Sequence, residues 1–189
     1  MFKLIWKTNS ETNCYLQCIQ CRVGRVFFLL FAVCRACVIA VTGSDTTTVS
    51  SNLSLLDQMG GDITKQDAPV FFPTSLYRHI DDAEVEDKVR FLKETIYQIT
   101  KLFDGNMKSV TWDKKNLDDF LNILERQLEN LNSCLSPAMK PERRLKRYFK
   151  KLNKNVLRKM NYSAQAWELI RKETKRHLQR LDILAAQMY

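Results

Sequence analysis

Apolar side chains recur every three or four residues along most of this 189-residue chain, and that spacing places them on one face of a helix. Four long stripes show the spacing, over residues 85–103, 117–134, 145–160 and 167–185. The five glycines and four prolines all lie outside these stripes and divide the pattern into helix-sized pieces. The pattern therefore predicts a single all-α helical bundle, rather than a turn-rich β fold or a continuous coiled coil.

A shorter apolar face within residues 53–59 predicts a weak first helix, which a Gly-Gly pair ends. The residues before it, 44–51, are rich in serine and threonine, and we expect a flexible lead-in there. A long connection follows as far as about Pro73. Its residues 70–72 are Val-Phe-Phe, which is too apolar for a free loop, so we expect these side chains to pack across the bundle.

A brief helix is expected over residues 74–80, just before the first long stripe. Asp81 and Glu84 then stand where a capping pair would open the next helix. In such a pair, each side chain accepts a hydrogen bond from a backbone N–H near the start of the helix. We therefore predict that the helix of the first long stripe starts at this capping pair.

The N-terminal segment has the pattern of a secretory signal peptide. Residues 26–33 form an eight-residue apolar run, two arginines precede it, and small residues permit cleavage after Ala36. The run is too short to span a membrane. We therefore predict a signal peptide over residues 1–36, a single mature domain over residues 37–189, and a secreted protein.

Two alternatives to this processing remain open. Cleavage after Gly43 also satisfies the small-residue rule, and an uncleaved N-terminus would leave an intracellular helical protein. The cysteines favour the earlier cut, because cleavage after Ala36 leaves two of the six, Cys37 and Cys134, which is an even number for an oxidising compartment. Cleavage after Gly43 would leave Cys134 unpaired.

The positive charge lies at the C-terminal end of the chain. Residues 141–189 hold fourteen Lys or Arg against four Asp or Glu, a net +10, so the rest of the chain carries −1 of the total +9. The excess indicates either a solvated helix surface or an anionic partner, such as nucleic acid, an acidic membrane or an acidic receptor face. A basic helical module that binds nucleic acid or a membrane is therefore the main alternative function. Full apolar faces, few aromatic residues among the cations and the lack of a nucleic-acid-binding motif count against it.

No sequence motif indicates catalysis. The chain has no P-loop, dinucleotide fingerprint, H-E-x-x-H motif or nucleophile elbow. His79 precedes Asp81, but no serine or cysteine nucleophile is placed by the sequence to use this pair. His177 lies on the basic last helix, and we expect it at or near the surface. Neither histidine stands at ligand spacing from a cysteine pair, so we predict no metal site, no cofactor and no enzymatic activity.

Two sequons, at Asn52 and Asn161, could carry glycans in a secreted protein. Asn161 stands at the predicted turn into the last helix, where a glycan would be accessible. The N-x-S/T motif is common by chance, and both sites are predictions for a secreted protein.

The start of the last helix resembles a known family. The pair Tyr162-Ser163 precedes Ala166-Trp167-Glu168, and Arg171 follows the tryptophan by four residues. This is similar to the last-helix signature of type I interferons. Arg147-Tyr148-Phe149 and Phe72-Pro73 add to the resemblance, which covers about residues 53–186. The segments at 53–56, 59–61, 85–89 and 163–167 resemble the fish branch of the family more specifically.

The resemblance implies a five-helix, up-up-down-down helical cytokine bundle with a long first connection. Such a protein would be secreted and would hold two class II cytokine receptor chains together, which triggers JAK-STAT signalling and antiviral gene expression. The last helix and the first connection would bind one receptor chain, and the second to fourth helices the other. We expect a protein that is mostly monomeric, with no nucleic-acid partner and no stable insertion into membranes.

The resemblance also points to individual residues. Trp167 lies on the apolar stripe, and we expect it to anchor the last helix in the core. Arginine suits a receptor contact because its planar guanidinium pairs with carboxylates through two parallel hydrogen bonds. The candidate receptor contacts are Arg171, Arg176, Lys172 and Lys175 on the last helix and, more weakly, Arg147 and Lys150 for the second receptor chain.

The family commonly has two disulfides, and this chain matches one of them. Cys37 and Cys134 correspond to the pair that links the mature N-terminus to the end of the third long helix. The second pair joins the first connection to a position beside the tryptophan, which is Gln165 here, and the first connection has no cysteine. The chain thus resembles the two-cysteine group of fish interferons, which leaves open what holds its first connection in place.

Overall fold

The computed structural model describes residues 47–134 and 142–188, and every regular element in these two ranges is a helix. The all-α prediction is therefore confirmed. The helices are α3 (Thr47–Gln58), α4 (Thr74–Asp81), α5 (Val85–Phe103), α6 (Lys114–Cys134), α7 (Arg143–Leu152), the π-helix η1 (Asn153–Arg158) and α8 (Ala164–Ala186). No helix of this described part is long and apolar enough to cross a membrane.

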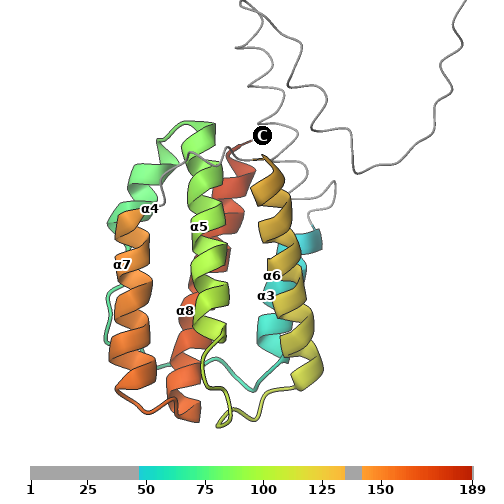
Figure 1. Ribbon diagram of the computed structural model, residues 1–189, viewed down its shortest axis with the longest axis vertical. Helices are drawn as coiled ribbons and strands as arrows, with labels where there is room; N and C mark the ends of the chain where they lie inside the picture. The colour runs from blue at the N-terminus through green and yellow to red at the C-terminus, as the bar shows by residue number, and fades with distance from the viewer. Residues whose placement is uncertain (1–46, 135–141, 189) are drawn as a thin grey trace, which may run out of the picture. The chain divides into compact units, whose positions relative to one another are not determined.

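The four helices α3, α5, α6 and α8 form an up-up-down-down bundle. The colours of Figure 1 show that α3 and α5 run in one direction and that α6 and α8 run in the opposite one. The parallel pairs require long connections. The first, which contains α4, joins α3 to α5, and the second carries α7 and η1 between α6 and α8. In the bundle α3 packs against α6 and α8, and α5 packs against α6, α7 and α8.

The predicted apolar stripes form the core. Leu124 and Leu131 of α6 are completely buried, as are Val156 and Ile170 of the last two stripes. Phe120 of α6 is also completely buried, although it was not in the predicted stripe. The predicted helices and the buried faces of the long stripes thus agree with the structure, because tertiary packing uses the face that the sequence makes apolar.

Trp167 is completely buried, which confirms its predicted role as a core anchor. Its indole Nε1 donates a hydrogen bond of 3.0 Å to the carbonyl oxygen of Asn106, in the loop after α5. The ring lies so close to Gly105 that a methyl group there would stand 3.3 Å from two of its carbons. Trp167 therefore joins the start of α8 to the loop between α5 and α6.

Three local predictions are wrong. Helix α3 begins at Thr47, so most of the expected flexible lead-in is helical. Asp81 ends α4, and Glu84 precedes α5 without a capping hydrogen bond from its side chain; the Asp81 carboxylate accepts a hydrogen bond of 2.8 Å from Arg180. In the first connection, Val70 is buried and Phe72 packs on the core, but Phe71 is 99% exposed.

Candidate functional site

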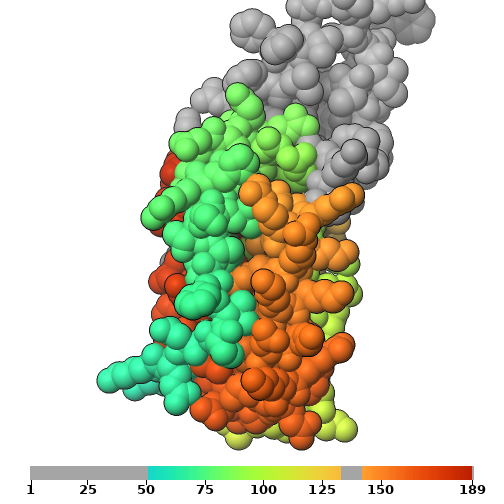
Figure 2. Space-filling model, turned by 90° about the vertical axis from the view of Figure 1, so that its left-hand side faces the viewer, coloured from blue at the N-terminus to red at the C-terminus, as the bar shows by residue number. Residues whose placement is uncertain are grey.

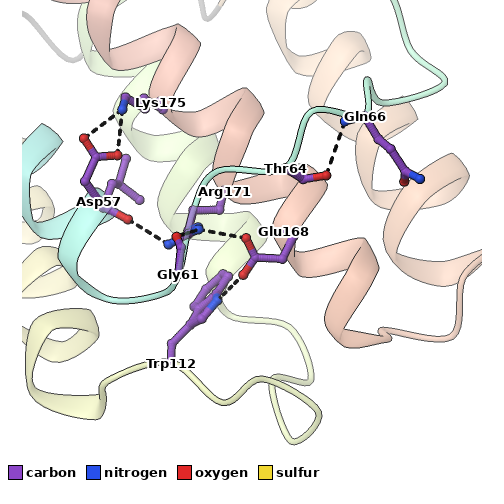
Figure 3. A network of polar contacts seen from close by, with 9 residues as sticks. Asp57, Gly61, Thr64, Gln66, Trp112, Glu168, Arg171 and Lys175 are labelled. Atoms are coloured by element: carbon purple, nitrogen blue, oxygen red, sulfur yellow. Dashed lines mark hydrogen bonds and ion pairs between the residues drawn. The ribbon is translucent and has the colours of Figure 1, made fainter.

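The first half of α8 faces α3 and the first connection, and the side chain of Arg171 on this face is completely buried. Its terminal nitrogens donate hydrogen bonds to the carbonyl oxygens of Leu56, at 3.2 Å, and of Gly61. Nη2 also forms an ion pair of 2.9 Å with Glu168, one helical turn earlier. Arg171 therefore ties the end of α3 and the start of the first connection to α8 (Figure 3).

Trp112 and Gly60 enclose this guanidinium. The indole of Trp112 donates a hydrogen bond of 2.6 Å to Glu168, and its ring lies 5.9 Å from Cζ of Arg171 (Figure 3). A methyl group on Gly60 would stand 2.4 Å from Nη1 of Arg171 and 2.9 Å from the Trp112 ring. Only glycine leaves room at position 60 for this arrangement.

The next contacts along α8 hold the middle of the first connection. Lys172 donates hydrogen bonds to the carbonyl oxygens of Lys65, at 3.0 Å, and Gln66, at 2.7 Å. Its ammonium also forms an ion pair of 2.9 Å with Asp67, which lowers the pKa of that exposed carboxyl. The side chains of Gln165 and Gln66 share a hydrogen bond of 2.8 Å. This contact joins the first connection to the start of α8, the two segments that the resemblance links by a second disulfide in relatives.

Two further cations of α8 are also paired within the molecule. Lys175 forms an ion pair of 2.6 Å with Asp57 at the end of α3 (Figure 3). Arg176 pairs with Glu173 at 2.9 Å, and its guanidinium lies 4.5 Å from the centre of the Phe72 ring. The cation therefore covers the aromatic ring that anchors the first connection.

His177 is completely buried, so its predicted surface position is wrong. The rings of Phe72 and Phe149 lie 4.8 and 4.9 Å from it, centre to centre, and its Nδ1 shares a hydrogen bond of 2.6 Å with the hydroxyl of Tyr77. Burial, together with the nearby charge of Arg176, lowers the pKa of His177 to about 3. The imidazole is thus neutral at physiological pH and belongs to the core.

A buried hydrogen bond also links α7 to α8. The hydroxyl of Tyr148 donates to the carboxylate of Glu173 at 2.7 Å, and the same carboxylate pairs with Arg176. Burial and the adjacent Glu173 carboxylate raise the pKa of Tyr148, so its hydroxyl keeps the proton that it donates. The ion pair and the hydrogen bond together satisfy Glu173, which is 1% exposed.

These contacts correct the prediction for Arg171. We expected a receptor contact at the surface, but the guanidinium is completely buried and its terminal nitrogens are engaged by the first connection and Glu168. Its role is to position the first connection. Lys172, Lys175 and Arg176 are paired in the same way, but their side chains remain 19%, 25% and 41% exposed and border the surface.

Phe71 is the most exposed large apolar side chain of the described residues. It is 99% exposed, although its neighbours Val70 and Phe72 are held against the core. Sequence reasoning missed it because the Phe-Phe pair was treated as one apolar unit. In an extended segment, adjacent side chains point in opposite directions, so the burial of one of them implies the exposure of the other.

The other predicted contacts, Arg147 and Lys150, lie on α7 and are solvent-exposed. Their helix buries Leu145, Tyr148, Phe149 and Leu152 and turns its cations outward. Figure 2 shows α7 as an orange ridge beside the teal and green first connection. The structure therefore brings Lys172, Lys175 and Arg176 together around the first connection and leaves Arg147 and Lys150 on a separate helix.

The two sequons differ in exposure. Asn52 is 1% exposed and its side-chain amide donates a hydrogen bond of 3.3 Å to Gln127 of α6, so this fold has no room for a glycan there. The prediction of glycosylation at Asn52 is therefore wrong for the folded protein. Asn161 is exposed, in a tight turn where its φ of 51° is left-handed. Glycosylation at Asn161 remains a prediction.

The predicted disulfide falls outside the described residues, because they include neither Cys37 nor the side chain of Cys134. Within the part of the chain that is described, no group of three or more His, Cys, Asp or Glu residues is arranged to hold a metal ion.

The bundle topology and the long first connection held against the last helix are those of a helical cytokine. Residues 42–188 match the family model of the interferon alpha/beta domain, and the chain therefore belongs to the type I interferon family. Because this is a family of cytokines, the prediction that the chain is not an enzyme is confirmed.

Individual relatives place the chain in the fish branch. It is 94% identical to interferon a3 of Oncorhynchus mykiss over 137 residues, which cover 72% of this chain and 78% of that one. It is 35% identical to interferon omega-2 of Equus caballus over 95 residues, 45% of this chain and 48% of the relative. Among solved structures, zebrafish interferon 1 superposes with a TM-score of 0.71 at 39% identity, covering 79% of this chain and 99% of that one.

Proposed function

We propose that this protein is a secreted interferon that binds two class II cytokine receptor chains, and so triggers JAK-STAT signalling and antiviral gene expression. The observation that carries the proposal is the interferon family match over residues 42–188, which includes every described residue of the bundle. The protein acts as a monomer with two binding faces. Binding of the first receptor chain then raises the effective concentration of the second on the membrane.

The first face consists of the first connection around Phe71 and the adjoining cations of α8. A fully exposed phenylalanine on a segment that is tied down has little conformational entropy to lose on binding, which suits a central contact of an interface. The side chains of Lys172, Lys175 and Arg176 form the partly exposed rim. Rim charges of this kind govern the association rate and the choice of partner more than the affinity.

The second face lies on α7, where Arg147 and Lys150 are exposed. Helix α7 packs against α5, so a receptor chain that contacts α7 would also reach α5. Support for this face is the exposure of its cations and their separation from the first connection. It requires a receptor surface rich in carboxylates, because arginine and lysine donate hydrogen bonds and accept none.

Secretion depends on the N-terminal segment. We propose that residues 1–36 are removed as a signal peptide, and that Cys37 and Cys134 then form a disulfide across a loop of nearly one hundred residues. In the chain-entropy model, a disulfide across a loop of this length stabilises the fold by about 4.7 kcal/mol. Asn161 would be available for glycosylation along the same route.

The test is to express the full chain in fish cells, transfer the medium to fresh cells and follow STAT phosphorylation and antiviral gene induction. We expect a response that soluble receptor ectodomain abolishes. Cells that retain the protein, with inactive medium, would contradict secretion and favour a non-secreted form of the same cytokine. Active secretion with a response that the ectodomain leaves unchanged would contradict receptor dimerisation.

A further inference from the structure

The cations of α7 and η1 differ from those of α8 in having almost no partners. Eight Lys or Arg lie in residues 143–158, with no Asp or Glu among them, and all eight are solvent-exposed. Only Arg144 forms an ion pair with another described residue, at 3.4 Å from Glu142. All five cations of α8, in contrast, are paired within the molecule. Ion pairs within the fold therefore account for the basic residues of α8, but they do not account for most of those of α7 and η1.

Four of these cations form a straight row. Arg143, Arg147, Lys150 and Lys154 follow one another at spacings of four, three and four residues, which is the repeat of one helix face. Arg143, Arg147 and Lys150 lie opposite the buried face of α7 and span about 10 Å at a helical rise of 1.5 Å per residue, and Lys154 follows them in η1. Lys146 and Lys151 flank the row. Such a row matches a linear polymer with a negative charge on each repeat.

We propose that this row, here called the α7 cation row (Arg143, Arg147, Lys150 and Lys154), binds a sulfated polysaccharide. Clusters of Lys and Arg on an exposed helix attract such polyanions, and arginine can donate two parallel hydrogen bonds to one anionic group. The site is distinct from the face around Phe71. Arg147 and Lys150 also belong to the proposed second receptor face, so a sulfated chain would compete with that receptor chain.

Two other classes of polyanion fit the row less well. Single-stranded nucleic acid binds through aromatic side chains that stack on its bases, but both aromatic residues of α7, Tyr148 and Phe149, are buried. A membrane surface holds an amphipathic helix by its apolar face, and the apolar face of α7 is occupied by the core. The exposed face of α7 therefore offers a partner a line of positive charges, and a flexible sulfated chain can follow such a line.

The experiment uses the full chain and immobilised heparin as the probe. The test variant replaces all four members of the row with glutamine (R143Q, R147Q, K150Q and K154Q). The control variant removes the same charge from exposed cations outside α7 and α8 (K108Q, K114Q, K115Q and R126Q). Glutamine forms helices about as well as lysine or arginine, so both variants should fold. Far-UV circular dichroism and the melting temperature check that they do.

We expect the wild type and the control to bind heparin at physiological salt, and the row variant, which loses four cations, to bind roughly 600-fold more weakly, because each cation near an anionic surface contributes about fivefold. Equal losses in the two variants would overturn the proposal and leave net charge as the cause. So would equally tight binding to poly(U) RNA or to vesicles of phosphatidylserine and phosphatidylcholine, since either would show a site without preference for sulfated sugars.

Discussion

Arg171 holds the first connection in the structure, and Phe71 is the exposed residue that we propose for the receptor contact. The sequence predicted that receptor contact at Arg171 instead. The guanidinium is buried and holds the first connection, whereas the side chain of Phe71, in the same connection, is 99% exposed. The distinction turns on burial, which spacing along a helix does not reveal. Arg171 and its carbonyl partners are 110 to 115 residues apart in the sequence, so only the folded chain shows them together.

Replacing Arg171 and Phe71 in turn should separate stability from receptor binding. We expect Arg171→Ala to lower the free energy of unfolding by about 3 kcal/mol, because it removes the cation that pairs with Glu168 and leaves two carbonyl oxygens without this donor. Phe71→Ala should leave stability within about 0.5 kcal/mol of the wild type. It should nevertheless weaken binding to the receptor ectodomain by roughly tenfold or more. Urea unfolding and surface plasmon resonance measure the two quantities. A stable Arg171→Ala protein would refute the buried role, and unchanged affinity of Phe71→Ala would remove Phe71 from the interface.

His177 should make stability depend on pH. Its pKa is about 3 in the folded protein, against about 6.5 in an unfolded chain, so the unfolded state binds more protons between these values. The contribution is complete above pH 6.5 and is lost as the pH falls towards 3, by about 1.4 kcal/mol per pH unit. Urea unfolding between pH 7 and pH 4 should show this slope. The variant His177→Phe should show a shallower one, and parallel slopes would argue against His177 as the source.

At the level of the elements, the structure answers the question left by the missing second disulfide. The first connection is held by Arg171, Lys172 and the Gln66–Gln165 hydrogen bond, and by the ring of Phe72 under Arg176. Several separate contacts thus take the place of one covalent bond. The stripes predicted the four long helices well, because burial of an apolar face dominates helix placement. The contacts of the connection were not predictable, because they join positions that are distant in sequence.

The two adjacent glycines of the first connection offer a matched comparison. Gly60→Ala should destabilise the protein by about 1–3 kcal/mol, because the added methyl group would overlap the Arg171 guanidinium and the Trp112 ring, both of which are held in place. Gly61→Ala meets nothing within 4 Å and should be neutral or slightly stabilising. Thermal unfolding of both variants tests the packing of this turn. Equal melting temperatures would show that the guanidinium is free to move aside.

Trp167→Ala tests the attachment of α8 to the rest of the bundle. The substitution removes a completely buried ring and its hydrogen bond to Asn106, so we expect a loss of about 3–5 kcal/mol in the free energy of unfolding. Trp167→Phe keeps much of the volume and should cost less. An unshifted midpoint in urea for the alanine variant would be incompatible with the packing described.

At the scale of the whole molecule, the basic C-terminal end serves two purposes. The cations of α8 close the bundle over the first connection, and those of α7 face solvent, although composition alone shows a single positive region. Counting charges therefore predicted the excess of positive charge at the C-terminal end. It did not predict which cations are paired, because pairing depends on the carboxylates and carbonyl oxygens that the fold brings close to each cation. The surface around Phe71 and the surface of α7 are the two regions that we propose for receptor binding.

The central claim is that one molecule binds two receptor chains at separate faces. The most direct measurement is the mass, by light scattering after size-exclusion chromatography, of the protein mixed with the ectodomains of both class II receptor chains. The account predicts a complex that contains one cytokine and one copy of each ectodomain, and Phe71→Ala should selectively lose the chain bound at the first connection. Only binary complexes, with the two ectodomains displacing each other, would contradict it.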